Sequence, residues 1–138
     1  MSTLLLAACA ILFVDQWSKI VVGARVGHRA LVFGSIRIRY VEAHKSIYDS
    51  GIGRSLLALA WLAALASTFV LRKSGEWFQS ELSTAYLGMA FGGAASNLID
   101  VVRRGRIVDF IDLGWWPVFN IADIAIVGGL VMAFLLRL

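Results

Sequence analysis

The sequence predicts an all-α membrane protein with four transmembrane helices and a small β-sheet on one membrane face. Two observations predict this class. Of the 138 residues, 59% are hydrophobic and only 16% are charged, whereas soluble domains average about 45–50% apolar and about 25% charged residues. The apolar residues also gather in four segments of about 20 residues, the length that crosses a bilayer as a helix. This length of chain fits a single domain.

The four expected spans form one transmembrane domain, residues 1–138. The first covers about residues 3–22, and the second covers about 55–71 and ends in the basic pair Arg72-Lys73. The third covers about 82–102, and the fourth covers about 118–136. An even number of spans places both chain ends on the same side of the membrane.

Two stretches outside the spans alternate between apolar and polar residues, a pattern typical of strands. They read "SIRIRYVE", which begins at Ser35, and "RIVDFIDL", which begins at Arg106. We expect them to pair into a small sheet on one membrane face. The segment Trp115-Trp116-Pro117 then resembles an aromatic anchor at the membrane interface, leading into the fourth span.

The third span carries small residues spaced by four, at Gly88, Gly92 and Ser96. In a membrane helix such a row lets a neighbouring helix pack closely. We expect these three residues to serve packing.

Polar residues recur near one end of three spans. Asp15 and Lys19 are four residues apart in the first span, so they share a helix face and can form an ion pair. If the helices alternate in direction, the end of span one, the end of span three and the start of span four meet at one membrane face. The polar residues that this brings to one depth are Asp15, Lys19, Asn97, Asp100, Asp109, Asn120 and Asp123.

Charged groups inside a membrane are costly, so a functional site facing the bundle interior is the default interpretation. The alternative is a polar network that only holds helices together. For Asp15 and Lys19 both roles stay open. Asp109 and Asp123 have no evident basic partner in the sequence, which favours function. Two close carboxyl groups share a proton and can activate water, as in aspartic proteases.

No metal or other cofactor is expected. Cys9 is the only cysteine, which excludes an internal disulfide and a cysteine-based zinc cluster. The two histidines, His28 and His44, lack metal-site spacing. The net charge of +4 does not indicate nucleic acid here, because basic residues of membrane proteins more often meet lipid headgroups or set topology.

Four motifs in order resemble the bacterial lipoprotein signal peptidases, the signal peptidase II family. They are "DQWSK" from Asp15, "GGAASNLID" from Gly92, "GRIVDFID" from Gly105 and "FNIADIAI" from Phe119. The resemblance covers nearly the whole chain. It implies an intramembrane aspartyl endopeptidase that removes signal peptides from diacylglyceryl-modified prolipoproteins, before the lipidated cysteine.

The resemblance also implies roles for the polar residues. Asp109 and Asp123 would form the catalytic pair. The residues that would bind substrate or support the site are Asp15, Lys19, Asn97, Asp100 and Asn120. The protein would be a monomer in the bacterial inner membrane, with both termini cytoplasmic and the sheet on the exported side, in contact with membrane lipids and the lipidated precursor.

The chain departs from the family pattern at two places. The family usually has an Asn-x-Gly-Ala-Ala-Phe stretch after the first strand, where this chain has "EAHKSIYD", Glu42 to Asp49. We expect this stretch to cover the substrate entrance. The family also usually has Arg after "NLID", where Val101 stands here; Arg103 or Arg104 could then be the partner of Asp100.

Basic residues oppose the orientation that the family implies. Nine of the 13 Lys and Arg residues fall in the two loops expected outside, whereas the positive-inside rule places them in the cytoplasm. We give the motifs more weight than this count. Two alternatives stay open: a catalytically silent family member that binds lipoproteins or lipidated peptides, and a small proton-coupled transporter, although the chain lacks an internal repeat.

Overall fold

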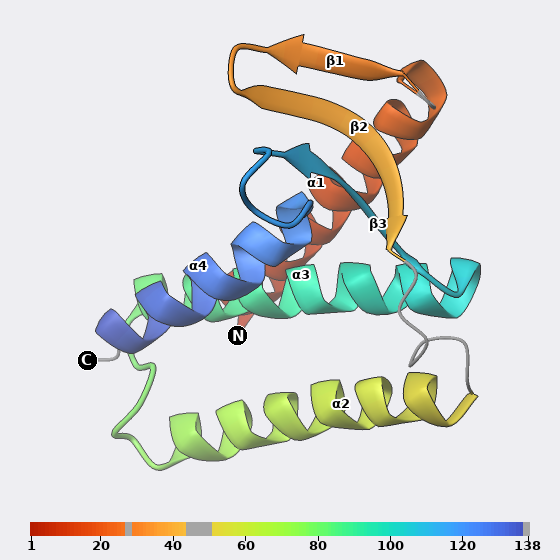
Figure 1. The fold of residues 1–138 in the computed structure, drawn as a ribbon. Coiled ribbons are helices and arrows are strands. Elements are labelled where there is room, and N and C mark those ends of the chain that lie inside the picture. Colours follow the sequence, from red (N-terminus) through yellow and green to blue (C-terminus); the bar gives the residue numbers. More distant parts are fainter. Residues whose placement is uncertain (27–28, 44–50, 137–138) are drawn as a thin grey trace.

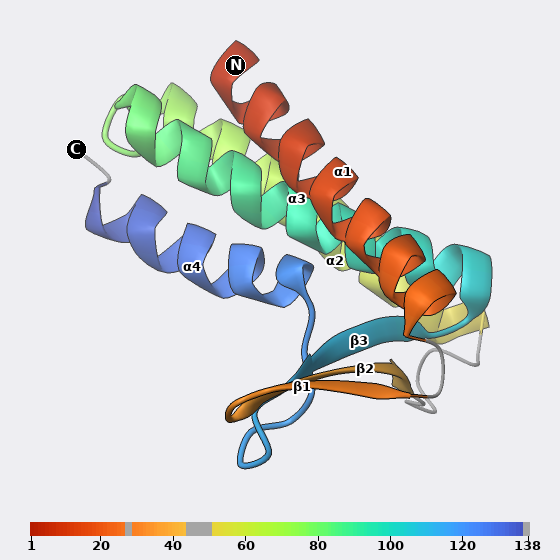
Figure 2. The same ribbon diagram turned by 90° about the horizontal axis from the view of Figure 1, so that it is seen from above.

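Four helices and three strands make up the fold in the computed structural model, which describes residues 1–26, 29–43 and 51–136. In chain order they are α1 (Ser2–Arg25), β1 (Ala30–Phe33), β2 (Ile36–Ala43), α2 (Gly51–Lys73), α3 (Glu81–Arg104), β3 (Ile107–Asp112) and α4 (Ile121–Leu135). The sheet lies at one end of the helices, where α1 and α3 end and α4 begins (Figures 1 and 2). We call this end of the molecule the sheet end. The expected fold class is confirmed.

The helices follow the four expected apolar segments, with different ends. The first three continue into the polar flanks, to Arg25, Lys73 and Arg104. Within the part of the chain that the structure describes, α1 and α3 are long and apolar enough to cross a membrane, and α4 is shorter.

The start of α4 corrects the expectation that the fourth segment is helical from Val118. The helix begins at Ile121, because Phe119 is bound to β3 by main-chain hydrogen bonds in both directions with Ile111. Asn120 then caps the helix: its side chain accepts the Asp123 N–H, and the Asp123 side chain accepts the Asn120 N–H. This reciprocal capping satisfies two donors that a helix start otherwise leaves open.

Helix α3 lies between α1 and α4 and contacts both at the level of the backbone. A Cβ built on Gly88 or Gly92 would lie 2.3 Å from the carbonyl oxygen of Leu4 or Ala8 in α1. On another side of α3, a Cβ on Gly93 would lie 2.5 Å from the Ala122 carbonyl oxygen. The packing role expected of Gly88 and Gly92 is therefore confirmed.

The sheet is antiparallel with the order β1-β2-β3. Pairing of the two expected strands, β2 and β3, is confirmed, and β1 is an additional strand at the edge. Along β3 the residues alternate between buried and half-buried. Phe110 packs on Val22 and Val26 of α1, so Asp109, the neighbour of Phe110, faces the other side of the strand.

The stretch from Glu42 to Asp49, which we expect to cover the substrate entrance, lies mostly outside the described residues. The structure describes the chain up to Ala43 and again from Gly51. Glu42 belongs to β2, where its carboxylate forms an ion pair with Arg106 (2.7 Å).

Candidate active site

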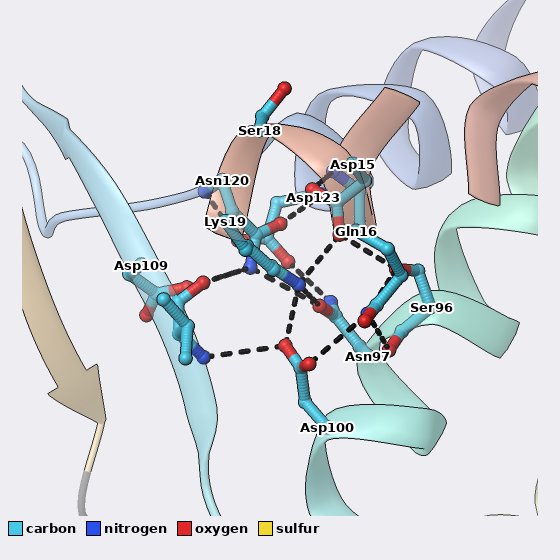
Figure 3. Close-up of polar contacts among 12 residues, drawn as sticks. Asp15, Gln16, Ser18, Lys19, Ser96, Asn97, Asp100, Asp109, Asn120 and Asp123 are labelled. Carbon is cyan, nitrogen blue, oxygen red and sulfur yellow. Dashed lines mark hydrogen bonds and ion pairs between the residues drawn. The ribbon is translucent and has the colours of Figure 1, made fainter. Parts of the chain in front are cut away.

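The seven polar residues expected to converge lie together at the sheet end, between α1, α3, β3 and the start of α4 (Figure 3). Asp15, Lys19, Asp100 and Asn120 are at most 1% exposed. Helix ends from distant parts of the sequence bring these groups to one place. The site is thus a product of tertiary packing and not of any single motif.

Lys19 has three partners in this cluster. Its ammonium lies 2.6 Å from Asp15 Oδ2 and 2.6 Å from Asp100 Oδ2, and it donates to Asn97 Oδ1 at 3.1 Å. An ammonium has three N–H donors, so each is used. A buried charge is tolerated only with such pairing and hydrogen bonding.

The two carboxylates that bind Lys19 also bind main-chain N–H groups. Asp15 Oδ1 accepts from the N–H of Ala122 at 2.9 Å, and Asp100 Oδ2 accepts from the N–H of Val108 at 3.4 Å. Ala122 directly precedes Asp123, and Val108 directly precedes Asp109. The ion pairs of Lys19 therefore connect the two chain segments that carry the expected catalytic pair.

Three further residues belong to the cluster. Gln16 donates to Ser96 Oγ (2.9 Å) and to Asp100 Oδ1 (3.1 Å), and Ser96 Oγ donates to Asp15 Oδ2 (2.7 Å). Ser96 thus does more than allow close packing. Besides Lys19, Arg104 pairs with Asp100 at 3.1 Å. Arg104 is one of the two arginines that the sequence left open for this role, and its spacing of four residues from Asp100 on one helix was the available signal.

Asn120 contacts both residues of the expected catalytic pair. Its side-chain nitrogen donates to Asp109 Oδ1 at 2.7 Å, and its main-chain N–H donates to Asp123 Oδ2 at 3.1 Å. Asn97 donates to the other Asp123 oxygen at 3.0 Å. Asn120 therefore donates a hydrogen bond to each of the two carboxyl groups. Asp123 lies in the first turn of α4.

Two cavities open at these carboxyl groups. Asp109 and Asp123 both line a cavity of about 260 Å³, which is closed on one side by residues 116–119. Asp123 and Asn97 also line a larger groove of about 420 Å³ between α2, α3 and α4. The other residues of this groove are almost all apolar, among them Trp61, Phe91 and Leu130. A mostly apolar pocket with a few convergent polar groups is typical of a ligand site.

The segment that closes the smaller cavity is held by Asp112, the last residue of β3. Its carboxylate accepts the Gly114 N–H at 2.8 Å and pairs with Arg39 at 2.7 Å and Arg37 at 3.5 Å. The Gly114 hydrogen bond, together with the two arginines, lowers the pKa of Asp112 below its ordinary value of 3.8. Gly114 has a φ of +82°, which a residue with a Cβ rarely adopts.

In the described ranges, no group of three or more His, Cys, Asp or Glu side chains is placed to hold a metal ion. The carboxylates of Asp15 and Asp100, in the same cluster, are paired with Lys19.

Comparisons with known proteins give a consistent result. A family model described as signal peptidase (SPase) II matches residues 7–138. The lipoprotein signal peptidase of Syntrophomonas wolfei is 37% identical over 115 residues, covering 80% of this chain and 74% of that protein. The lipoprotein signal peptidase of Dehalococcoides mccartyi is 33% identical over 138 residues, covering 96% and 86%.

The fold is also similar to that of a solved protein, a bacterial membrane enzyme determined by the in meso method at 1.9 Å resolution. The TM-score is 0.81 at 22% identity, over 99% of this chain and 92% of that one. At this identity the likeness concerns the fold alone.

Proposed function

The chain belongs to the signal peptidase II family of proteases, and on that premise we propose that it removes the signal peptide from diacylglyceryl-modified prolipoproteins. The cut falls before the lipidated cysteine. Asp109 and Asp123 are the catalytic pair. The observation that carries this proposal is the contact of Asn120 with both carboxyl groups, which also line one cavity.

The reaction uses water and one shared proton. Two close carboxyl groups do not ionise together easily, so one is a carboxylate while the other keeps its proton. The carboxylate takes a proton from a water molecule as that water attacks the scissile carbonyl carbon. The protonated carboxyl group donates its proton toward the carbonyl oxygen. Collapse of the tetrahedral intermediate then breaks the C–N bond: the leaving amine takes a proton from the pair, and a hydroxyl group of the intermediate returns its proton to the pair, which restores the single shared proton.

The remaining polar residues position the pair. Asn97 and Asn120 orient the carboxyl groups through their amide N–H donors. Asp15 and Asp100 fix the main chain beside Asp123 and Asp109, and Lys19 joins these two carboxylates. Of the two roles that the sequence left open for Asp15 and Lys19, these contacts support the structural one.

The groove between α2, α3 and α4 supports cleavage within the membrane plane. It begins at Asp123 and Asn97 and continues between apolar side chains toward Trp61 and Leu130, a lining that suits the apolar segment of a signal peptide. The proposed protein is a multi-pass protein of the bacterial inner membrane with both termini cytoplasmic and the sheet end exported.

A catalytically silent lipoprotein-binding protein, the alternative from the sequence, is not favoured by the comparisons, because the similar proteins are peptidases by name. The decisive experiment incubates the purified full chain with a diacylglyceryl-modified precursor and follows release of the signal peptide by mass spectrometry. Release that requires the lipid modification is expected. A verified, folded protein that binds the precursor without cleaving it contradicts the proposal.

A further inference from the structure

The two cavities at the catalytic pair meet at Asp123, which lines both of them. The larger groove continues from Asp123 along α4 to Leu130, away from the sheet end. The smaller cavity lies at the sheet end, between the β3 face that carries Ile107 and Asp109 and the loop that leads into α4 (Figures 1 and 2). A peptide cut at the pair therefore has one side of its scissile bond in the groove and the other side in the smaller cavity.

The proposed orientation decides which part of the substrate enters the smaller cavity. The signal peptide precedes the lipidated cysteine and lies in the groove, so the part that follows the scissile bond lies at the sheet end. Pockets for drug-sized ligands have volumes of about 300–1,000 Å³, and the smaller cavity has only about 260 Å³. The acyl chains of the cysteine therefore stay outside, and the cavity has room for main chain and one small side chain.

Trp116 limits the size of this cavity at its opening. Its side chain lines the cavity and is also 56% exposed, so the indole ring lies where the cavity opens to the outside. Of the two described tryptophans in this segment, only Trp116 lines the cavity, and Trp115 is 78% exposed. The two neighbouring rings therefore have different positions relative to the catalytic pair.

The loop that carries Trp116 is held in place. Its last residue, Phe119, accepts the Ile111 N–H at 2.8 Å and donates to the Ile111 carbonyl at 3.1 Å. Pro117 has a restricted φ, and the rings of Trp115 and Trp116 meet edge to face with centroids 5.7 Å apart. A wall that is fixed in this way discriminates by size, because its displacement would break these contacts.

We propose that the smaller cavity receives the residue that directly follows the lipidated cysteine, and that Trp116 restricts this residue to a small side chain. This subsite rests on the proposed function, to which it adds a selection among precursors. Ile107, Val118 and Phe119 supply an apolar lining, which suits alanine or serine at this substrate position. A bulky aromatic side chain at the same position would collide with the indole of Trp116.

A competition reaction measures this selection. Two diacylglyceryl-modified precursors, which differ only in having serine or tryptophan directly after the cysteine, are mixed in equal amounts with the purified full chain. The two cleaved lipoproteins differ in mass, so mass spectrometry gives their ratio. At low conversion this ratio equals the ratio of the two kcat/KM values.

The unaltered protein should favour the serine precursor at least about tenfold. Trp116→Ala should reduce this preference to about twofold, because the cavity loses the ring that limits its size. Trp115→Ala, which removes the neighbouring ring outside the cavity, should keep the preference of the unaltered protein. General damage to the site slows both precursors alike and leaves the ratio unchanged, so the ratio reports the subsite.

Equal cleavage of both precursors by the unaltered protein would overturn the proposal, and so would an equal loss of preference in the two tryptophan variants. If neither precursor is cleaved, the affinities of the two labelled precursors for the unaltered chain and for Trp116→Ala are compared by fluorescence anisotropy. Tighter binding of the serine precursor that Trp116→Ala abolishes would support the subsite although the proposed cleavage fails. Equal affinities would overturn the subsite as well.

Discussion

Asp15, in the middle of α1, accepts a hydrogen bond from the main-chain N–H of Ala122 at 2.9 Å, across more than a hundred residues of sequence. Asp100 makes the equivalent contact with Val108, and Lys19 pairs with both carboxylates. A buried cation therefore connects the chain segments beside Asp123 and Asp109. Four predictions concern this arrangement and its surroundings.

Lys19→Met should destabilise the protein by about 3–5 kcal/mol, because it leaves buried carboxylates without their cation. The measurement is the unfolding temperature in detergent, together with the cleavage rate. Lys73→Met is the control, since Lys73 is exposed at the opposite end and only approaches the Phe69 ring. Equal, small effects of the two substitutions would show that the buried ion pairs do not stabilise the site.

Asp109→Asn and Asp123→Asn should each lower the cleavage rate of a lipidated precursor by at least about 10²-fold, because an amide cannot share the proton of the pair. Both variants should remain folded. Glu76→Gln, which alters an exposed carboxylate far from the site, should cleave at the unaltered rate. Retention of most activity by either aspartate variant would exclude the proposed pair.

The Asp112 carboxylate should make the stability of the sheet depend on pH. Its pKa in the folded protein is lowered, so its contribution is fully present above 3.8 and is lost as the pH falls through the lower folded value. Asp112→Asn should therefore be less stable than the unaltered protein above pH 3.8, and the difference should shrink as the pH falls further. Denaturant unfolding followed by tryptophan fluorescence measures this; a difference that grows with acidity would contradict it.

Gly92→Ala should destabilise the packing of α1 on α3 by about 1–3 kcal/mol, since the new Cβ would lie 2.3 Å from a backbone oxygen. Gly128→Ala in α4 is the control, because a Cβ there meets nothing within 4 Å. Alanine at this helical position should be neutral or stabilising by up to about 1 kcal/mol. Thermal unfolding in one detergent compares the two, and similar outcomes would argue against backbone contact between α1 and α3.

Much of the fold could be predicted from local patterns. Alternation of apolar and polar residues places β2 and β3, and the cost of charge in a membrane singles out Asp15, Asn97 and Asp123 as a convergent set. The i, i+4 spacing also predicts the pair of Asp15 and Lys19, which the structure contains at 2.6 Å.

Other features depend on contacts between distant segments. The partner of Lys19 on α3 is Asp100, and no spacing in the sequence connects these two residues. The start of α4 moves to Ile121 because Phe119 pairs with Ile111 of β3. β1 has only four residues, none of them charged, so it carries no alternation that would distinguish it from a loop.

The side-chain nitrogen of Asn120 approaches three oxygens: Asp109 Oδ1 at 2.7 Å, Asn97 Oδ1 at 3.1 Å and the Val108 carbonyl at 3.2 Å. An amide group carries only two hydrogens, so the three oxygens compete for them. When Asp109 turns toward a substrate, the hydrogen it releases still has an acceptor within reach. We therefore expect the Asp109 carboxyl group to change hydrogen-bond partners at low cost. A buried N–H donor left without an acceptor would make this movement costly, and here the Asn120 N–H keeps an acceptor.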